Sequence, residues 1–308
     1  MENLPFSYIV GGQRRRPGLI EDRRILDDKI LKRYYPYSIS EHPSQPSCSL
    51  GQVDQLPDEL ILYVCLELTI PSLLAFRGVN RRARILIESL EPYRQVLEHC
   101  PYIIGACVAT EAYSFSINHL YNSLITSECA TCGNFGEHLY LITCQRVCST
   151  CYLKKKAYLP ITATAARRAG TSNKRLTQLP HFTSLPGRYT AGKLMHKKRT
   201  KYFDRTAVEQ EADPALWTKA TEKERDFGSV EPVRYKAIIS APYLGPSAGD
   251  VQWGLTCLAC SEDMQSPRYH ILYSQAGILD HLKDFGPVRR IGPLRYGRLS
   301  LMHVKETA

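Results

Sequence analysis

Residues 56–90 read LPDELILYVCLELTIPSLLAFRGVNRRARILIESL, and this stretch predicts three short helices. Apolar residues recur at helical spacing in its first part, at Leu60, Ile61, Val64 and Leu68. A second helix is expected to begin around Pro71 and to end at Gly78, and Asn80 suits the cap of a third. Three helices this short cannot bury all their apolar side chains among themselves, so we expect a face that docks on a second polypeptide.

The same stretch resembles the F-box. That motif runs as Leu-Pro-x-Glu, a helix rich in leucine and isoleucine, a proline before the second helix, and Val-(Ser/Asn)-(Arg/Lys) at the third. The residues at which this chain matches the pattern, and which the resemblance places at the docking face, are Leu56, Pro57, Leu60, Ile61, Pro71, Leu73, Leu74 and Val79. The resemblance implies binding to the Skp adaptor of a cullin–RING ubiquitin ligase, with the chain recruiting a substrate for ubiquitination. The alternative is that these side chains pack on later helices of the chain itself.

Two pairs of cysteines follow at the spacing Cys129-x2-Cys132-x15-Cys148-x2-Cys151. Fifteen residues between two such pairs allow a hairpin to fold back and to present four thiolates tetrahedrally to one zinc ion. Gly133 suits the turn after the first pair, where the backbone must approach the sulfurs. The pattern therefore predicts a structural zinc ribbon over residues 127–158, with a redox dithiol and unligated buried cysteines as alternatives. Four sulfur ligands leave no open position for a substrate, so catalytic zinc is not expected.

The likeness extends further along the chain. From about residue 54 to 285 the sequence resembles a group of fungal F-box proteins that carry a Cys-x-x-Cys ribbon after the helices. The segments that carry the likeness are Leu-Pro-Gly-Arg-Tyr at 185–189 and Trp-Gly-x-x-Cys-x-x-Cys at 253–260. The group implies an architecture and an adaptor role for this chain, but no substrate.

A second cysteine pair, Cys257 and Cys260, makes half of another metal site, and His281 follows on an expected helix. In the fungal group a cysteine four residues after that histidine supplies the fourth ligand. In this chain that position is Phe285. Two interpretations stay open, a finger with two cysteines and one histidine or a metal-free hairpin with residual cysteines, and the missing ligand favours the second.

The positive charge of the chain supports the main alternative function. The chain has 40 Lys and Arg against 30 Asp and Glu, a net charge of +10, which favours acidic partners. Residues 152–206 hold fourteen of the basic residues and one acid, and we interpret them as a solvated linker or, alternatively, as a polyanion-binding arm. Residues beside the second cysteine pair of the ribbon fit nucleic-acid binding by charge and stacking: Tyr140, Arg146, Tyr152, Lys154, Lys155, Lys156 and Tyr158. A zinc-ribbon nucleic-acid-binding protein is therefore the second interpretation.

Other classes find little support in the sequence. No Ser/His/Asp pattern and no phosphate-cradling glycine loop stands out, so we do not expect an enzyme. No secretory signal and no apolar run of about 18 residues occurs, so we expect a cytoplasmic or nuclear protein that does not span a membrane. The eleven cysteines are then expected to be reduced.

These observations predict a mainly α fold with small β elements: a three-helix F-box bundle with following helices, a zinc ribbon, a basic linker and a C-terminal β-hairpin module. The expected segments are a disordered basic arm at 1–52, the F-box and following helices at 53–126, the ribbon at 127–158, a low-order basic linker at 159–230, a hairpin with Cys-x-x-Cys and a histidine at 231–290, and a tail at 291–308.

Overall fold

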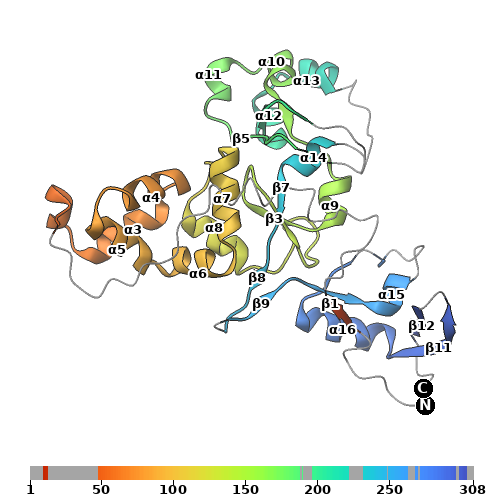
Figure 1. Ribbon diagram of the computed structural model, residues 1–308. Coiled ribbons are helices and arrows are strands. Elements are labelled where there is room, and N and C mark those ends of the chain that lie inside the picture. Colours follow the sequence, from red (N-terminus) through yellow and green to blue (C-terminus); the bar gives the residue numbers. More distant parts are fainter. Residues whose placement is uncertain are drawn as a thin grey trace.

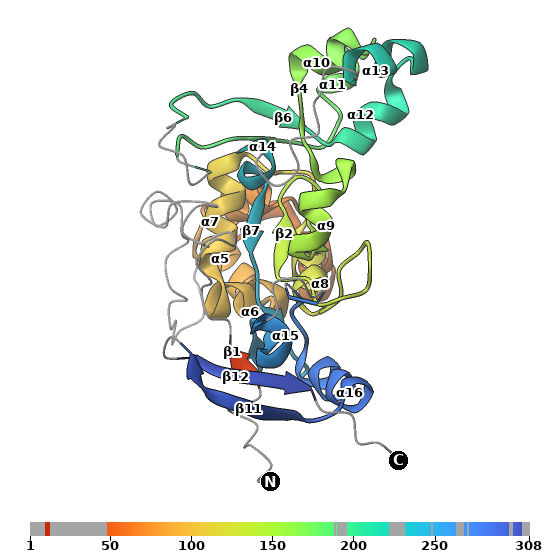
Figure 2. The same ribbon diagram turned by 90° about the vertical axis from the view of Figure 1, so that its right-hand side faces the viewer.

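The computed structural model describes residues 10–12, 48–187, 189, 196–221, 232–247, 249–262, 268–269, 271–295 and 298–303. The fold is mainly α with several small sheets, as predicted. The helices of residues 58–89, labelled α3 to α5, project to one side of a central body. A second lobe, which carries α10 to α13, caps that body, and the C-terminal elements around α15 and α16 lie at its other end (Figures 1 and 2). Among the described residues, no helix has the length and apolar character needed to cross a membrane.

The three helices predicted within residues 56–90 form there, and further helices precede and follow them. Together they are η2 (Gly51–Gln55), α3 (Asp58–Glu67), α4 (Ile70–Arg77), α5 (Arg81–Ser89), α6 (Glu91–His99), α7 (Pro101–Thr110) and α8 (Ile117–Leu124). The Asn80 side chain caps α5 by accepting a 2.9 Å hydrogen bond from the Ala83 N–H, and Ser116 caps α8 in the same way. Gly78 ends α4, so the predicted helix boundaries rest on local capping.

The segment after α8 folds into a small sheet and a helix. Its elements are β2 (His138–Tyr140), β3 (Gln145–Val147), α9 (Ser149–Lys154), η3 (Lys156–Tyr158) and the later β7 (Ile238–Ser240). The sheet order is β3-β2-β7, with both pairings antiparallel. β2 ends at Tyr140, and the chain turns back to β3 through Cys144, whose φ is 57°. One apolar core runs from Ile61 to Leu244, so the helices and the ribbon are packed together.

The prediction of a low-order linker at 159–230 was wrong for the described residues 161–187, 189 and 196–221. They form a lobe that contains β4 (Ile161–Thr162), α10 (Ala163–Arg168), α11 (Asn173–Leu176), β5 (His181–Thr183), β6 (Lys201–Phe203), α12 (Arg205–Glu211) and α13 (Pro214–Thr221). The sheet order is β4-β6-β5, and a small core of Ile161, Ala166, Leu176, Phe203 and Val208 lies under it. These apolar positions stand singly among basic residues on very short elements, so they show no period in the sequence. Residues 222–230 lie outside the described residues.

The C-terminal part also pairs differently from the prediction. Its elements are α14 (Pro232–Lys236), β8 (Tyr243–Leu244), β9 (Val251–Gln252), β10 (Leu255–Cys257), α15 (Leu258–Glu262), α16 (Gln275–Phe285), β11 (Val288–Arg295) and β12 (Arg298–His303). The hairpin expected within 231–290 does not include β7, because β7 joins β2 of the ribbon instead. The turn at 245–250 closes only the short β8–β9 pair.

Two segments expected to be unstructured contribute strands. β1 (Val10–Gly12), in the predicted disordered arm, pairs antiparallel with β10, and β12, in the predicted tail, pairs antiparallel with β11. The rest of the predicted arm, 1–9 and 13–47, lies outside the described residues. We use the term C-terminal module for β1, β10, α15, α16, β11 and β12 together.

Candidate docking surface and metal sites

An exposed apolar surface lies on the first helices. Along α3 and the turn before it, the exposed fractions are 47% for Leu56, 52% for Leu60, 70% for Tyr63 and 57% for Val64. Leu60, Tyr63 and Val64 stand at i, i+3 and i+4, so they share one face of α3. Of the eleven large hydrophobic side chains exposed among the described residues, six fall between 53 and 79, which concentrates the accessible apolar surface here. We call Leu56, Leu60, Tyr63 and Val64 the α3 stripe.

The residues predicted for docking divide into two groups. Leu56, Pro57, Leu60 and Val79 are exposed, and Pro71 and Leu74 are half-buried. Ile61 and Leu73, however, are buried in the core of the chain itself. Helix α3 is apolar on all sides, so the chain covers its Ile61 face and leaves the α3 stripe in the open. The alternative interpretation, packing within the chain itself, therefore applies to Ile61 and Leu73. Tyr63 and Val64 were missing from the predicted docking set, although their spacing from Leu60 places them on the same face of α3.

Polar contacts fix the backbone that presents the stripe. Arg82 on α5 forms ion pairs with Asp54 and Asp58, which flank Leu56. The Asn80 amide donates a 3.0 Å hydrogen bond to the Ser49 carbonyl oxygen. The backbone N–H of Leu50 donates to Asp54 and lowers the pKa of that carboxyl. The apolar stripe is therefore held on a preformed surface, and does not sit on an isolated helix.

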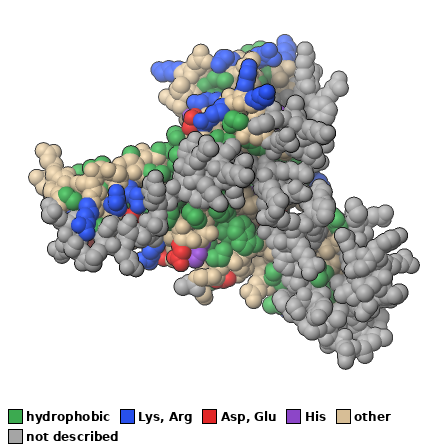
Figure 3. All heavy atoms as spheres, viewed as in Figure 1, with side chains coloured by type: hydrophobic (Ala, Val, Ile, Leu, Met, Phe, Trp, Pro, Cys, Tyr) green, Lys and Arg blue, Asp and Glu red, His purple; other side chains and the backbone are tan. Residues whose placement is uncertain are grey.

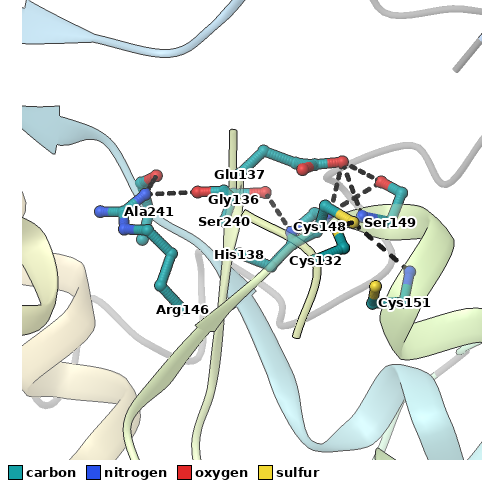
Figure 4. A network of polar contacts seen from close by, with 10 residues as sticks. All are labelled: Cys132, Gly136, Glu137, His138, Arg146, Cys148, Ser149, Cys151, Ser240 and Ala241. Atoms are coloured by element: carbon teal, nitrogen blue, oxygen red, sulfur yellow. Dashed lines mark hydrogen bonds and ion pairs between the residues drawn. The ribbon is translucent and has the colours of Figure 1, made fainter. Parts of the chain in front are cut away.

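The four ribbon cysteines come together as the spacing predicted. Cys129, Cys132, Cys148 and Cys151 place their sulfur atoms within 4.8 Å of one another. The Cys132 and Cys148 sulfurs are 3.6 Å apart, and Figure 4 shows these two residues beside Cys151. Tetrahedral zinc with Zn–S bonds of about 2.3 Å separates its sulfur ligands by about 3.8 Å, so the cluster fits the ion. Gly133 has a φ of 75°, the left-handed turn expected after the first pair.

Proton sharing within the cluster favours the thiolate form of one cysteine, Cys129. The Cys148 thiol donates to Cys129 and lowers the pKa of Cys129 to about 4, while the pKa of Cys148 is raised. Burial raises the pKa of Cys151 to about 12. The Cys151 N–H donates to the Cys148 sulfur at 3.4 Å, so the backbone at the start of α9 also approaches the cluster. Since zinc binds thiolates, metal binding would release the protons that remain.

A buried arginine joins this ribbon to its surroundings. Arg146 on β3 is 2% exposed, and its guanidinium donates to backbone carbonyl oxygens only (Figure 4). The acceptors are Ser123 and Leu124 of the α8 end, Gly136 before β2, and Ala241 and Pro242 after β7. Burial lowers the pKa of Arg146 to about 10, so the group stays charged at neutral pH. It connects three chain segments that are far apart in sequence.

The structure also assembles a second cluster. Cys257, Cys260 and His281, the predicted half site, are joined by His303, and all four ligand atoms lie within 4.8 Å of one another. The structure thus adds a fourth residue, from the expected tail, to the three that the sequence offered. The signal in the sequence is weak: Leu299, Leu301 and His303 alternate, which indicates a strand but no metal. His270 lies outside the described residues.

The predicted nucleic-acid-binding set was wrong for its aromatic part. Tyr140, Tyr152 and Tyr158 are at most 5% exposed and pack in the core, so no base can stack on them. Arg146 is buried as described above. Exposed Lys and Arg side chains nevertheless gather on the lobe of residues 161–221 (Figure 3), among them Arg167, Arg168, Lys174 and Arg175.

Comparison with known proteins agrees with the geometry of the first helices. The F-box domain family matches the chain over residues 53–95, the region that holds α3 to α5 and the α3 stripe. Neither the comparison with curated proteins nor the comparison with solved structures gave a match. The stretch that presents the exposed apolar face is therefore an F-box domain, and the chain is an F-box protein.

Proposed function

We propose that the chain is a non-catalytic adaptor that binds the Skp subunit of a cullin–RING ubiquitin ligase through the α3 stripe and recruits a protein for ubiquitination. An F-box domain supports a ubiquitin-ligase adaptor role in general. The observation that carries the finer proposal is the exposure of Leu60, Tyr63 and Val64 on one face of a fixed helix. Helices of a partner can cover such a face, as in helix-in-groove recognition.

The remainder of the chain would hold the recruited protein near the ligase. Zinc at Cys129, Cys132, Cys148 and Cys151 would fix the ribbon, which shares its core with the F-box helices. Recruitment of this kind contributes proximity, while the chemistry of ubiquitin transfer belongs to the partners. All eleven cysteines are free thiols, which fits a reducing compartment such as the cytoplasm or nucleus.

The double variant Leu60→Asp with Tyr63→Asp is expected to weaken binding to the purified Skp adaptor by at least about 100-fold. Each change removes an apolar side chain worth about 1.5–3 kcal/mol when buried and places a carboxylate in the contact. Isothermal titration of wild type and variant measures the loss. Both side chains are more than half exposed in the chain alone, so the fold does not depend on them.

Leu279→Asp on α16 is the matched control, because Leu279 is 47% exposed and lies outside the F-box domain. It is expected to bind the Skp adaptor like wild type. Undiminished binding by the double variant, with an unchanged circular dichroism spectrum, would contradict the proposed docking face.

The basic lobe supports a second candidate function, binding of a nucleic acid. Its exposed Lys and Arg side chains offer charge, but the described residues near it present no stacking platform. Binding of this kind should fall steeply as salt rises, whereas apolar docking on the Skp adaptor should not. Titration of single-stranded RNA at two salt concentrations separates the two functions.

A further inference from the structure

Four side chains from four elements meet in the C-terminal module. Cys257 ends β10, Cys260 lies on α15, His281 on α16, and His303 ends β12. His303 Nε2 lies 3.2 Å from Cys257 Sγ, 3.4 Å from Cys260 Sγ and 3.2 Å from His281 Nε2. His281 Nε2 lies 3.5 Å from Cys260 Sγ. The two sulfurs and two nitrogens, each supplied by a different helix or strand, therefore surround one point.

These separations match the edges of a metal tetrahedron. Zinc bonds of about 2.3 Å to sulfur and about 2.05 Å to nitrogen give edges of about 3.6 Å between sulfur and nitrogen and about 3.4 Å between two nitrogens. The observed values of 3.2–3.5 Å fall within a few tenths of an ångström of these edges. No outward movement of the backbone is needed for the ion to fit.

The histidines are prepared as ligands. The other ring nitrogen of His303, Nδ1, lies 2.8 Å from the Gly286 carbonyl oxygen and donates its proton to it. That tautomer leaves the lone pair on Nε2, the atom that faces the cysteines. His281 is 4% exposed, and its Nε2 also faces Cys260. Two imidazole nitrogens and two sulfurs that face one position form a ligand set suited to a metal cation.

Among the residues of this module whose burial the structure describes, the fully buried apolar cluster is small. It consists of Cys257, Ala259, Cys260, Ile278 and Val288, so two of the five members are the cysteines themselves. Domains with a small apolar core usually depend on a metal or a disulfide, and both cysteines are free thiols. A metal would supply free energy of folding.

We propose that Cys257, Cys260, His281 and His303 bind a second structural zinc ion, with His303 as the fourth ligand. Two thiolates and two neutral imidazoles balance the charge of Zn²⁺, and the mixed set with closed tetrahedral geometry is typical of zinc. A redox role for the Cys-x-x-Cys pair would not use either histidine. The ion fastens β12, and with it the β11–β12 hairpin, to α15 and α16. This inference does not depend on docking to a ligase.

Phe285, four residues after His281, is the position at which the sequence analysis looked for a fourth ligand and found none. Phe285 packs on the His281 ring with 4.9 Å between centroids and lies 6.0 Å from the ring of His303. It covers one side of the cluster. A cysteine at that position is therefore close enough to compensate for the loss of His303.

Elemental analysis of the purified 308-residue chain, grown with zinc, tests the proposal. Wild type is expected to hold two zinc ions, and His303→Ala one. The control His119→Ala, which removes an exposed histidine on α8 outside both clusters, is expected to keep two. His303→Cys is also expected to keep two, since it restores a ligand to the same strand end. Limited proteolysis of His303→Ala should cut the β11–β12 hairpin at least tenfold faster than wild type.

The pair His303→Ala with Phe285→Cys provides a second measurement in case His303→Ala does not fold, and its recovery of two zinc ions supports the site. Cobalt substitution distinguishes the ligand sets, since two sites with different thiolate numbers absorb at different wavelengths. A single zinc ion in wild type that disappears with Cys148→Ser would overturn the proposal. So would two zinc ions retained by folded His303→Ala.

Discussion

Cys148→Ser is expected to remove one zinc ion from the chain and to unfold the ribbon. Structural zinc sites contribute apparent binding free energies of about 10–16 kcal/mol at pH 7, and this energy is available only to the folded state. Cys148 serves the site twice, because its sulfur is a ligand and also accepts the Cys151 N–H at the start of α9. Zinc content and a thermal unfolding scan measure the two effects together.

Cys144→Ala is the matched control for this change. Cys144 is a buried thiol of the same ribbon, but it lies outside the cluster of four. We expect the control to keep its zinc and to lose about 1 kcal/mol of stability from a small cavity. A well-folded wild-type chain without zinc, or a Cys148→Ser variant with its full zinc content, would contradict the assignment.

The unfolding of the ribbon in Cys148→Ser is expected to destabilise the neighbouring helices as well. Leu139, Val147 and Tyr152 belong to the same core as the helices α6 to α8, so an unfolded ribbon exposes apolar surface on both. The F-box helices α3 and α4 lie at the far side of that core. We therefore expect Skp binding by Cys148→Ser to be weakened less than by substitutions in the α3 stripe.

The parts of the fold that could be predicted are those encoded locally. Asn80 and Gly78 mark helix ends by their own side chain or its absence, and Asp58 and Glu59 suit the first turn of α3. The Cys-x-x-Cys spacing encodes a hairpin that brings its own ligands together. In both cases the interacting residues lie within about twenty positions of one another, so the pattern and the contact coincide.

The parts that could not be predicted depend on pairing over long separations. β7 lies beside β2 although about a hundred residues separate them, and Val10 faces Cys257 across the β1–β10 pair. Strands of two or three residues carry almost no periodic signal, so neither their existence nor their register is visible in the sequence. His303 is the clearest case, because only the β11–β12 pairing brings it to a cluster 22 residues from His281.

The same distinction applies within the docking surface. The pattern identified Leu60 and Ile61 together as apolar and helical, but it could not tell which of them faces the core. That choice depends on where α4 and the later helices pack, and it turns Ile61 inward and Leu60 outward. Substitutions at Ile61 or Leu73 would therefore test stability, whereas those at Leu60 and Tyr63 test binding.

Arg146→Met is expected to destabilise the chain by about 3–5 kcal/mol, the cost of removing one member from a buried charged network. Methionine keeps much of the apolar stem but none of the five donors. The backbone carbonyl oxygens of Ser123, Gly136, Ala241 and Pro242 then lose a charged donor in a place closed to water. Urea unfolding should show a lower midpoint with little change in slope.

Two controls separate the donor geometry from charge alone. Arg167→Met removes an exposed guanidinium and is expected to change stability by less than about 0.5 kcal/mol. Arg146→Lys keeps the positive charge but offers a single ammonium where acceptors from three segments converge, so we expect a loss close to that of Arg146→Met. If Arg146→Lys behaved like wild type, charge rather than the guanidinium fork would join the ribbon to α8 and to the segment after β7. A loss for Arg146→Met of under about 0.5 kcal/mol would show that the carbonyl oxygens find other donors and that the network does not hold these segments together.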